Sequence, residues 1–288
     1  SFEYSCRPKS RQEKKRQVQV ARRSLKVMAG TFVLTVSLIL CMVFVPKKNA
    51  LDTLQKRETK AKETGKMTEE QLAKQKANGS ESDDTICTAD LTDDEILEGL
   101  NLLLIGDSIA VDVTDDFYEM FPNSVSDTKI GRITSLGKQV LDSYIDEKKW
   151  EGEGVIFASL SNSPINGELE DIREKIGKDM PLFLTTVRIP HETFEEESNS
   201  KIKKFVKEND HTYLIDWYAA SEGHDEYFDA DDTHLLPAGA KAYAKCIKEA
   251  VLAAYKKENI EIPKSRLVSS TDTSTDSSND SSTDTSTE

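Results

Sequence analysis

The sequence has few of the residues that build metal and phosphate sites. It contains four histidines, four cysteines and 13 glycines in 288 residues. No group of His, Cys, Asp and Glu has the spacing of metal ligands, and no glycine-rich phosphate-binding loop occurs. The sequence therefore predicts neither a metal site nor a cofactor site.

Positive charge is scarce outside the first part of the chain. The formal net charge is −14, yet residues 1–45 carry nine Lys and Arg against Glu3 and Glu13, a local charge of about +7. Residues 46–288 therefore carry about −21. Binding to nucleic acid needs clustered cations, so this acidic body excludes nucleic acid as the expected partner.

One long run lacks charge altogether. Residues 27–45, VMAGTFVLTVSLILCMVFV, contain no charged side chain, and a helix of that length spans about 28 Å, close to a bilayer core. A cleaved signal peptide is the alternative, but no small-residue cleavage site follows the run. We expect a transmembrane helix, with residues 1–26 in the cytoplasm and the chain after about residue 46 outside.

The chain also lacks an initiator methionine, since it begins Ser-Phe-Glu. We expect a piece of a longer protein, in which residues 1–26 would be a cytoplasmic loop between two membrane helices. A trimmed protein with a single span is the alternative.

Two segments outside the expected folded body are poor in apolar residues. Residues 46–95 are charged, and we interpret them as a stalk outside the membrane, with Thr68–Gln71 resembling a capping box that opens a short helix. A second capping box, Thr92–Glu95, leads into the body. Residues 258–288 are rich in Ser, Thr and Asp and are predicted to form a disordered tail.

Strand-like and helix-like segments alternate between residues 96 and 257. Strands are expected over 101–105, 125–129, 154–159, 181–187 and 212–216. Helices are expected over 111–121, 134–148, 167–178, 192–208 and 237–257. The alternation predicts an α/β domain whose parallel sheet is covered on both faces, with any site at the carboxyl ends of its strands.

A serine follows the first predicted strand at that edge. The apolar run 102–105 leads into Gly106-Asp107-Ser108-Ile109, and an amphipathic segment follows. A serine on such a turn exposes its hydroxyl and has its own N–H at a helix N-terminus, where negative charge is stabilised. A nucleophile that passes through an oxyanion needs that environment. Gly-Asp-Ser is also ordinary turn chemistry, so the turn by itself leaves the role open.

A base for this serine has to come from the four histidines. His234 is the informative one, because Asp231 precedes it by three residues in a loop that leads to the last helix. A carboxylate there can accept the Nδ1–H while Nε2 faces outwards, which would put the acid and base of a triad on one loop. Asp232 is the rival acid, and a helix N-cap region with a surface histidine is the structural alternative. The other histidines are expected at the surface (His191, His211 and His224).

These residues resemble the SGNH/GDSL hydrolase superfamily, whose marks are a GDS turn, a glycine, an asparagine and a DxxH sequence in that order. The matching residues are Gly106-Asp107-Ser108, Gly131, Asn162, Asp231 and His234. The domain most closely resembles the extracytoplasmic domain of peptidoglycan O-acetyltransferases. That resemblance is carried by Thr128–Arg132, Val187–Pro190, Leu214–Tyr218 and His234–Tyr243, and covers about residues 96–257.

The resemblance implies a three-layer, flavodoxin-like fold and a set of roles. Ser108 would be acylated, His234 would be the base, Asp231 would orient it, and Ser108, Gly131 and Asn162 would form the oxyanion hole. The acetyl group would pass to a hydroxyl of peptidoglycan glycan strands outside the cell membrane, without a cofactor. The donor would come from a membrane acyltransferase part, expected in the same full-length chain. An acyl esterase and an inactive glycan-binding module are the alternatives.

Three further features leave two interpretations each. Arg188 lines an acceptor groove or forms a structural ion pair. Trp217 stacks on a sugar ring or packs in the core. Cys87 and Cys246 would both lie outside the membrane and form a disulfide, or stay unpaired.

Overall fold

The computed structural model describes residues 52–76 and 84–267. The chain divides into two compact units, Ser1–Lys56 and Arg57–Glu288. Of the first unit only residues 52–56 are described, and they are helical. No helix in the described ranges is long and apolar enough to cross a membrane. The span expected at residues 27–45 lies outside those ranges.

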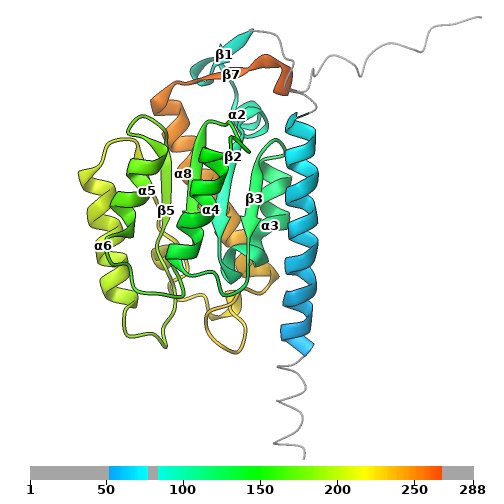
Figure 1. Ribbon diagram of the computed structural model, residues 1–288. Coiled ribbons are helices and arrows are strands. Elements are labelled where there is room, and N and C mark those ends of the chain that lie inside the picture. Colours follow the sequence, from blue (N-terminus) through cyan, green and yellow to red (C-terminus); the bar gives the residue numbers. More distant parts are fainter. Residues whose placement is uncertain (1–51, 77–83, 268–288) are drawn as a thin grey trace, which may run out of the picture. The chain divides into compact units, whose positions relative to one another are not determined.

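A five-stranded parallel sheet forms the centre of the second unit (Figure 1). Its strands are β2 (Leu102–Gly106), β3 (Val125–Thr128), β4 (Gly154–Ala158), β5 (Leu182–Thr185) and β6 (Thr212–Ile215). Their spatial order is β3-β2-β4-β5-β6, which is the flavodoxin-like order of doubly wound folds. The α/β class and the parallel sheet predicted from the sequence are confirmed.

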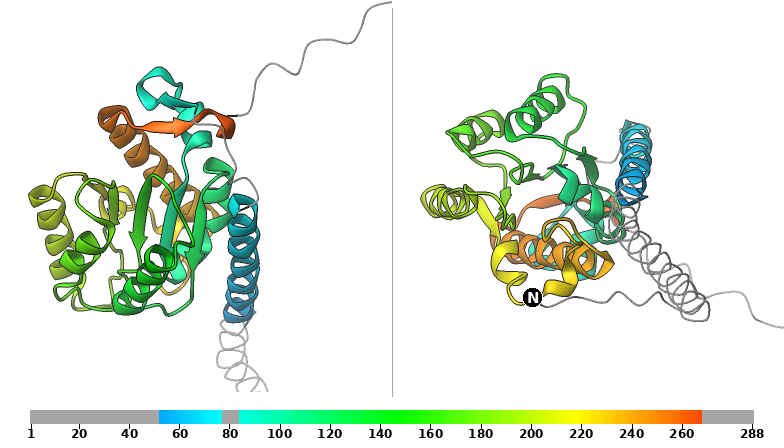
Figure 2. Two further views of the ribbon diagram at one scale, coloured as in Figure 1. Left: turned by 45° about the horizontal axis from the view of Figure 1, so that its top comes forward. Right: turned by 90° about the horizontal axis from the view of Figure 1, so that it is seen from below.

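Helices cover both faces of this sheet (Figure 2). The bounds are α2 (Asp93–Gly99), α3 (Ser108–Met120), α4 (Thr134–Asp146), α5 (Glu168–Ile176), α6 (Glu195–Glu208), α7 (Trp217–Ala220) and α8 (Pro237–Glu258). Successive side chains of β2 enter different cores: Leu102 and Leu104 pack with α2, α3 and α8, whereas Leu103 and Ile105 pack with α4, α5 and α6. Since strand side chains alternate between faces, a strand buried on both sides reads as the continuous apolar run in the sequence.

The structure also contains a two-stranded sheet, which the sequence did not predict. β1 (Thr85–Cys87) pairs antiparallel with β7 (Glu261–Pro263), with Ile86 opposite Ile262. The prediction of a disordered tail from residue 258 is therefore wrong for residues 258–267, because α8 extends to Glu258 and Ile262 of β7 is fully buried. The rest of that tail, residues 268–288, lies outside the described residues.

The helix at residues 52–76 is longer than expected. The capping box expected at Thr68–Gln71 is wrong, since Thr68 lies inside the helix. Its Oγ1 is 2.9 Å from the carbonyl oxygen of Thr64 and 2.5 Å from that of Ser126 in β3. The second box is confirmed, with the Thr92 side chain and Glu95 capping α2 reciprocally.

The part of this helix from Arg57 onwards belongs to the same compact unit as the sheet. At its far end the Gln75 amide donates to Asn101 Oδ1 and to the Asn123 carbonyl, both at 2.9 Å. The division into a stalk up to residue 95 and a domain from residue 96 stays a prediction, but these contacts join the two parts.

Candidate active site

Ser108 lies where β2 ends, as the first residue of α3. The turn before it has no room for a side chain at Gly106, where a Cβ would lie 2.1 Å from the Cβ of Ala110. Glycine therefore lets the strand pass directly into the helix, and the Ser108 N–H lies at the positive end of α3.

Asp107 fastens this turn from inside the protein. Its side chain is fully buried, and its two oxygens accept the N–H groups of Ile109 (3.0 Å) and Ser161 (3.1 Å). Burial raises the pKa of Asp107, while these N–H groups and the charge of His234 oppose the rise. Asp107 thereby caps α3 and ties the Ser108 turn to the loop after β4.

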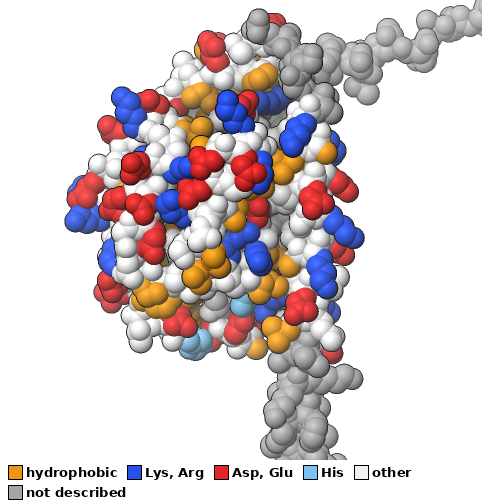
Figure 3. Space-filling view, viewed as in Figure 1, with side chains coloured by type: hydrophobic (Ala, Val, Ile, Leu, Met, Phe, Trp, Pro, Cys, Tyr) orange, Lys and Arg blue, Asp and Glu red, His pale blue; other side chains and the backbone are white. Residues whose placement is uncertain are grey.

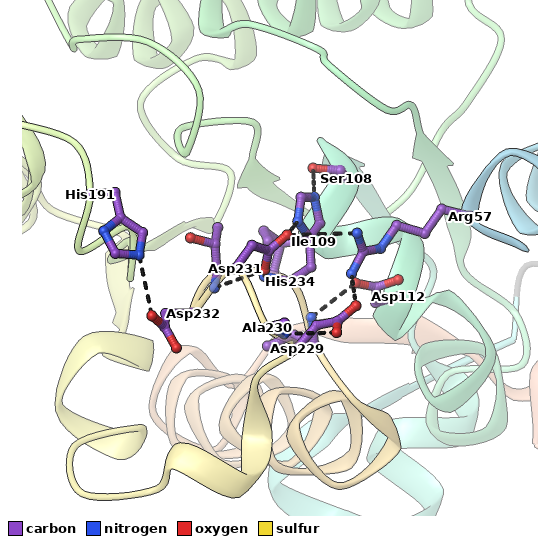
Figure 4. Close-up of polar contacts among 12 residues, drawn as sticks. Arg57, Ser108, Ile109, Asp112, His191, Asp229, Ala230, Asp231, Asp232 and His234 are labelled. Carbon is purple, nitrogen blue, oxygen red and sulfur yellow. Dashed lines mark hydrogen bonds and ion pairs between the residues drawn. The ribbon is translucent and has the colours of Figure 1, made fainter. Parts of the chain in front are cut away.

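His234 joins Ser108 to Asp231 in one chain of contacts (Figure 4). His234 Nε2 is 2.9 Å from Ser108 Oγ, and Nδ1 is 2.7 Å from Asp231 Oδ2. The other oxygen of Asp231 accepts the backbone N–H groups of Thr233 (3.2 Å) and His234 (2.9 Å). An Nδ1–H donated to the carboxylate leaves Nε2 free to accept the serine proton. The structure thus brings together the three side chains that the sequence singled out.

The hydrogen bonds to Asp231 also affect its charge. Partial burial raises the pKa of Asp231, but the bonds from the His234 backbone and ring outweigh burial, and the pKa is lowered overall. Asp231 is therefore ionised at neutral pH, as the partner of an imidazolium has to be.

The rival acid, Asp232, faces elsewhere. Its Oδ2 is 3.2 Å from His191 Nε2, and both side chains are exposed. Asp232 has a φ of 55°, in the left-handed region. The structure places Asp231, and not Asp232, against His234.

Gly131 lies in the loop between β3 and α4. Its φ of 70° is in the left-handed region, where a residue with a side chain would be strained. The next residue, Arg132, is buried and holds this loop against the end of β2. Its Nη1 donates to the Gly106 carbonyl at 3.1 Å, and its Nη2 pairs with Asp127 Oδ1 at 2.6 Å.

Asn162 lies in the loop after β4, which is joined to the Gly131 loop. Ser159 Oγ donates to the Arg132 carbonyl at 3.0 Å, and the hydroxyls of Thr134 and Ser163 are 3.0 Å apart. Asn162 Oδ1 is buried and has no hydrogen-bond partner within the described ranges. The loops that carry Ser108, Gly131 and Asn162 are thus fastened to one another.

Sequence reasoning gave no role to Arg132. Its stretch, Thr128–Arg132, enters the predictions only through the resemblance to peptidoglycan O-acetyltransferases. A buried arginine cannot be told from a surface one by sequence spacing, because its partners, Gly106 and Asp127, are assembled by strand pairing.

The two residues with weaker assignments lie away from this chain of contacts. Arg188 stacks its guanidinium over the Tyr218 ring, 5.1 Å from the centroid. Trp217 is 2% exposed and packs against Tyr243. A substrate role for Trp217 is therefore wrong: a buried ring has no free face for a sugar, and the core interpretation holds. Cys87 and Cys246, left open above, are both free thiols.

A cleft of about 700 Å³ adjoins the Gly131 loop. Its lining includes Gly131, Ile130 and Leu136, together with Leu72 and Thr68 of the helix at 52–76. Apolar side chains are exposed in and beside the Gly131 loop: Ile130, Ile133 and Leu136 are all more than a third exposed. Figure 3 shows hydrophobic patches among charged side chains on one face of the molecule. Within the described ranges no three His, Cys, Asp or Glu side chains gather as metal ligands.

Comparison with known proteins shows what this arrangement is similar to. No family model matches the sequence. O-acetyltransferase OatA of Staphylococcus aureus strain NCTC 8325 is 32% identical over 146 residues, which are 50% of this chain and 24% of that protein. OatA of strain MRSA252 matches equally. The chain resembles part of an O-acetyltransferase. It spans about a quarter of the length of these curated relatives.

A solved structure supports the same fold. The C-terminal catalytic domain of Streptococcus pneumoniae peptidoglycan O-acetyltransferase A, with a methylsulfonyl adduct, aligns with a TM-score of 0.51 and 20% identity. The alignment covers 58% of this chain and 99% of that domain. The curated relatives confirm the resemblance to O-acetyltransferases drawn from the sequence motifs, and the fold is similar to that of the pneumococcal catalytic domain.

Proposed function

We propose that this chain carries an SGNH-type O-acetyltransferase domain, which moves an acetyl group through Ser108 onto a hydroxyl of peptidoglycan. The proposal rests above all on the contacts Asp231–His234–Ser108, at 2.7 and 2.9 Å. The likeness to OatA supports acetyl as the group and peptidoglycan as the acceptor.

In the first step His234 Nε2 takes the Ser108 proton while Oγ bonds to the carbonyl carbon of the donor ester. The resulting tetrahedral intermediate collapses, its bond to the leaving oxygen breaks, and His234 returns the proton to that oxygen. Asp231 keeps Nδ1 protonated and stabilises the imidazolium. The product is an acetyl ester on Ser108.

In the second step a sugar hydroxyl takes the place of the departed group. His234 removes its proton, the sugar oxygen attacks the acetyl carbon, and Ser108 Oγ leaves with that proton. Each of the two steps passes through a tetrahedral intermediate that carries an oxyanion. The hydrogen-bond donors for this oxyanion are the N–H of Ser108, the N–H of Gly131 and the amide of Asn162. Loss of one such donor costs about 3 kcal/mol of transition-state stabilisation.

The wider setting is also part of the proposal. Residues 27–45 would span the cell membrane and leave the domain outside, where peptidoglycan lies. The acetyl donor would be delivered by a membrane acyltransferase part of the full-length protein. Arg188, half-buried beside Tyr218, is the candidate for contacting the glycan.

The first test is Ser108→Ala, assayed with a chromogenic acetyl ester. We expect ester turnover to fall to background, because alanine lacks the hydroxyl that lies against His234. The thermal unfolding midpoint should stay close to that of the wild type. Turnover that survives in this variant would overturn the assignment of Ser108.

The second test addresses the acceptor. With the ester and peptidoglycan oligomers present, mass spectrometry should detect acetylated oligomers with the wild-type chain and none with Ser108→Ala. If free acetate is the product under all acceptor conditions, water is the acceptor and the domain is an esterase.

A further inference from the structure

A cationic side chain of the helix at 52–76, Arg57, contacts the loop that carries Asp231 and His234. We call this loop, residues 229–234, the acid–base loop. Arg57 Nη2 donates to Asp229 Oδ2 at 2.8 Å, and Nη1 lies 3.7 Å from Asp231 Oδ2 (Figure 4). That Asp231 oxygen is the one 2.7 Å from His234 Nδ1. The guanidinium and the imidazole therefore face the same carboxylate oxygen.

Burial distinguishes this contact from an ordinary surface ion pair. The Arg57 side chain is 13% exposed, against 28% for Asp229 and 45% for Asp231. A guanidinium withdrawn from water interacts more strongly with neighbouring charge, and its planar fork fixes the direction of both contacts.

Arg57 can influence the whole loop because its partner Asp229 is hydrogen-bonded to other residues of the loop. The Asp229 N–H donates to the His234 carbonyl at 2.8 Å, and the Asp232 N–H donates to the Asp229 carbonyl at 2.9 Å. The loop thus closes on Asp229, and the only cation within 4 Å of its carboxylate in the described part of the chain is Arg57.

Arg57 is itself held in place by the rest of its helix. One turn later, Lys60 Nζ donates to the Asp112 carbonyl of α3 at 2.8 Å. Farther along, Thr68 and Gln75 contact the domain through Ser126 and Asn101. The guanidinium is therefore presented by an element anchored along its length.

We propose that Arg57 is a positioning residue for the triad: it holds Asp229 and Asp231 so that the acid–base loop presents His234 to Ser108. The helix at 57–76 then contributes a positioning side chain to the active site. This inference rests on the proposed function and deepens it.

The sign of the electrostatic effect follows from the groups that face His234. Asp231 lies on its own loop, Asp107 faces it from the turn before α3, and Asp112 faces it from α3. Arg57 approaches from the helix at 57–76, whose Lys60 contacts Asp112. A positive charge nearby opposes formation of the imidazolium, and a negative charge favours it. Removal of the Arg57 charge should therefore move the acidic limb of the activity profile to higher pH.

The test compares Arg57→Gln, Asp229→Asn and Gln75→Ala in the full chain, with kcat/KM for a chromogenic acetyl ester measured across pH. We expect Arg57→Gln to lower kcat/KM by about tenfold and to move the acidic limb of the profile to higher pH. Asp229→Asn should also lower kcat/KM but move that limb to lower pH. Gln75→Ala loosens the far end of the helix and should leave both unchanged.

Two results would overturn the inference. One is an Arg57→Gln variant with wild-type kcat/KM and acidic limb. The other is a variant that loses activity with an unmoved limb and a thermal midpoint lowered as in Gln75→Ala, which would mean that Arg57 serves helix docking alone.

A third variant covers the case in which Arg57→Gln does not fold. Arg57→Lys keeps the charge without the fork, so reduced kcat/KM with a wild-type acidic limb supports the inference, and wild-type kcat/KM overturns it. Ser108→Ala is measured in parallel. If that variant still turns over ester, the proposed function fails independently of any result at Arg57.

Discussion

The Ser108 turn and the acid–base loop, 229–234, meet at a single hydrogen bond but are held in different ways. The turn is fastened from inside: Asp107 is fully buried and bonded to two backbone N–H groups, and Gly106 packs directly against Ala110. The loop is fastened from outside, by carboxylates that remain partly in water, and by Arg57.

The difference indicates which half of the site tolerates change. The serine is positioned by strand pairing and close packing, which hold as long as the domain is folded. The histidine is positioned by partly exposed carboxylates and by the Arg57 guanidinium, and such charged contacts respond to pH, salt and single substitutions. Changes in the loop should therefore abolish activity under milder conditions than those needed to destabilise the turn.

The largest effect is expected at Asp231 of the loop. Asp231→Asn should lower kcat/KM for an acetyl ester by roughly 10³- to 10⁴-fold, because an amide cannot hold His234 in the required tautomer. Stability should change little, since Asp231 is half-exposed. The measurement is steady-state kinetics alongside thermal unfolding.

Asp232→Asn is the matched control, one residue along the same loop and paired with exposed His191. It should keep kcat/KM within about threefold of the wild type, as surface ion pairs contribute little. Equal losses of kcat/KM in Asp231→Asn and Asp232→Asn would contradict the assignment of Asp231, and not Asp232, as the acid.

An intermediate effect is expected in the turn. Gly106→Ala places a methyl group 2.1 Å from the Ala110 Cβ, and such overpacking costs about 1–3 kcal/mol of unfolding free energy. Activity should fall too, because the relief of the clash displaces the start of α3 and with it Ser108. Chemical denaturation at neutral pH measures the loss.

The double variant Gly106→Ala with Ala110→Gly tests the cause. It removes the clashing methyl group, so it should be more stable than Gly106→Ala alone despite the cost of a helical glycine, about 1 kcal/mol. No gain in the double variant would show that the close approach is not what requires glycine.

The smallest effect concerns how stability depends on pH. The contributions of Asp231 and Asp107 to the free energy of unfolding should change with pH in opposite directions. The pKa of Asp231 is lowered by hydrogen bonds from His234, so it stabilises the folded state above the unfolded carboxyl pKa and loses that contribution as pH falls. The pKa of Asp107 is raised by burial, so its contribution is greatest at low pH and is lost as pH rises through the folded value.

Urea unfolding from neutral pH down to about pH 3 measures both slopes. The stability of the wild type relative to Asp231→Asn should decline as the solution is acidified, and relative to Asp107→Asn it should increase. Slopes of the same sign would contradict the contrast between an outer and an inner carboxylate.

The sheet and the three contacting side chains could be predicted because their signals are local. Four apolar residues in a row, Leu102 to Ile105, indicate a central strand. The carboxyl ends of parallel strands meet at one edge, so Ser108 is expected beside the residues that follow the other strands. Asp231 and His234 lie three positions apart on one loop, so their contact depends on little else.

Arg57 could not be found in this way. Its partner Asp229 is 172 positions away, and the contact exists only because a whole helix docks beside the sheet. In the same region the sequence predicts a helix cap at Thr68, whereas its hydroxyl contacts Ser126. Trp217 was ambiguous because an aromatic residue suits a sugar site and a core equally well before burial is known.

The pairing of β1 with β7 has a practical consequence for studying the protein on surfaces. It lies where α8 ends, and α8 begins just after His234, so its 22 residues separate Leu267 from the active site by about 30 Å. A biotin attached at Leu267 would therefore lie at the far end of α8 from Ser108 and His234. The proposed acetylation of glycan could then be tested on an immobilised sample.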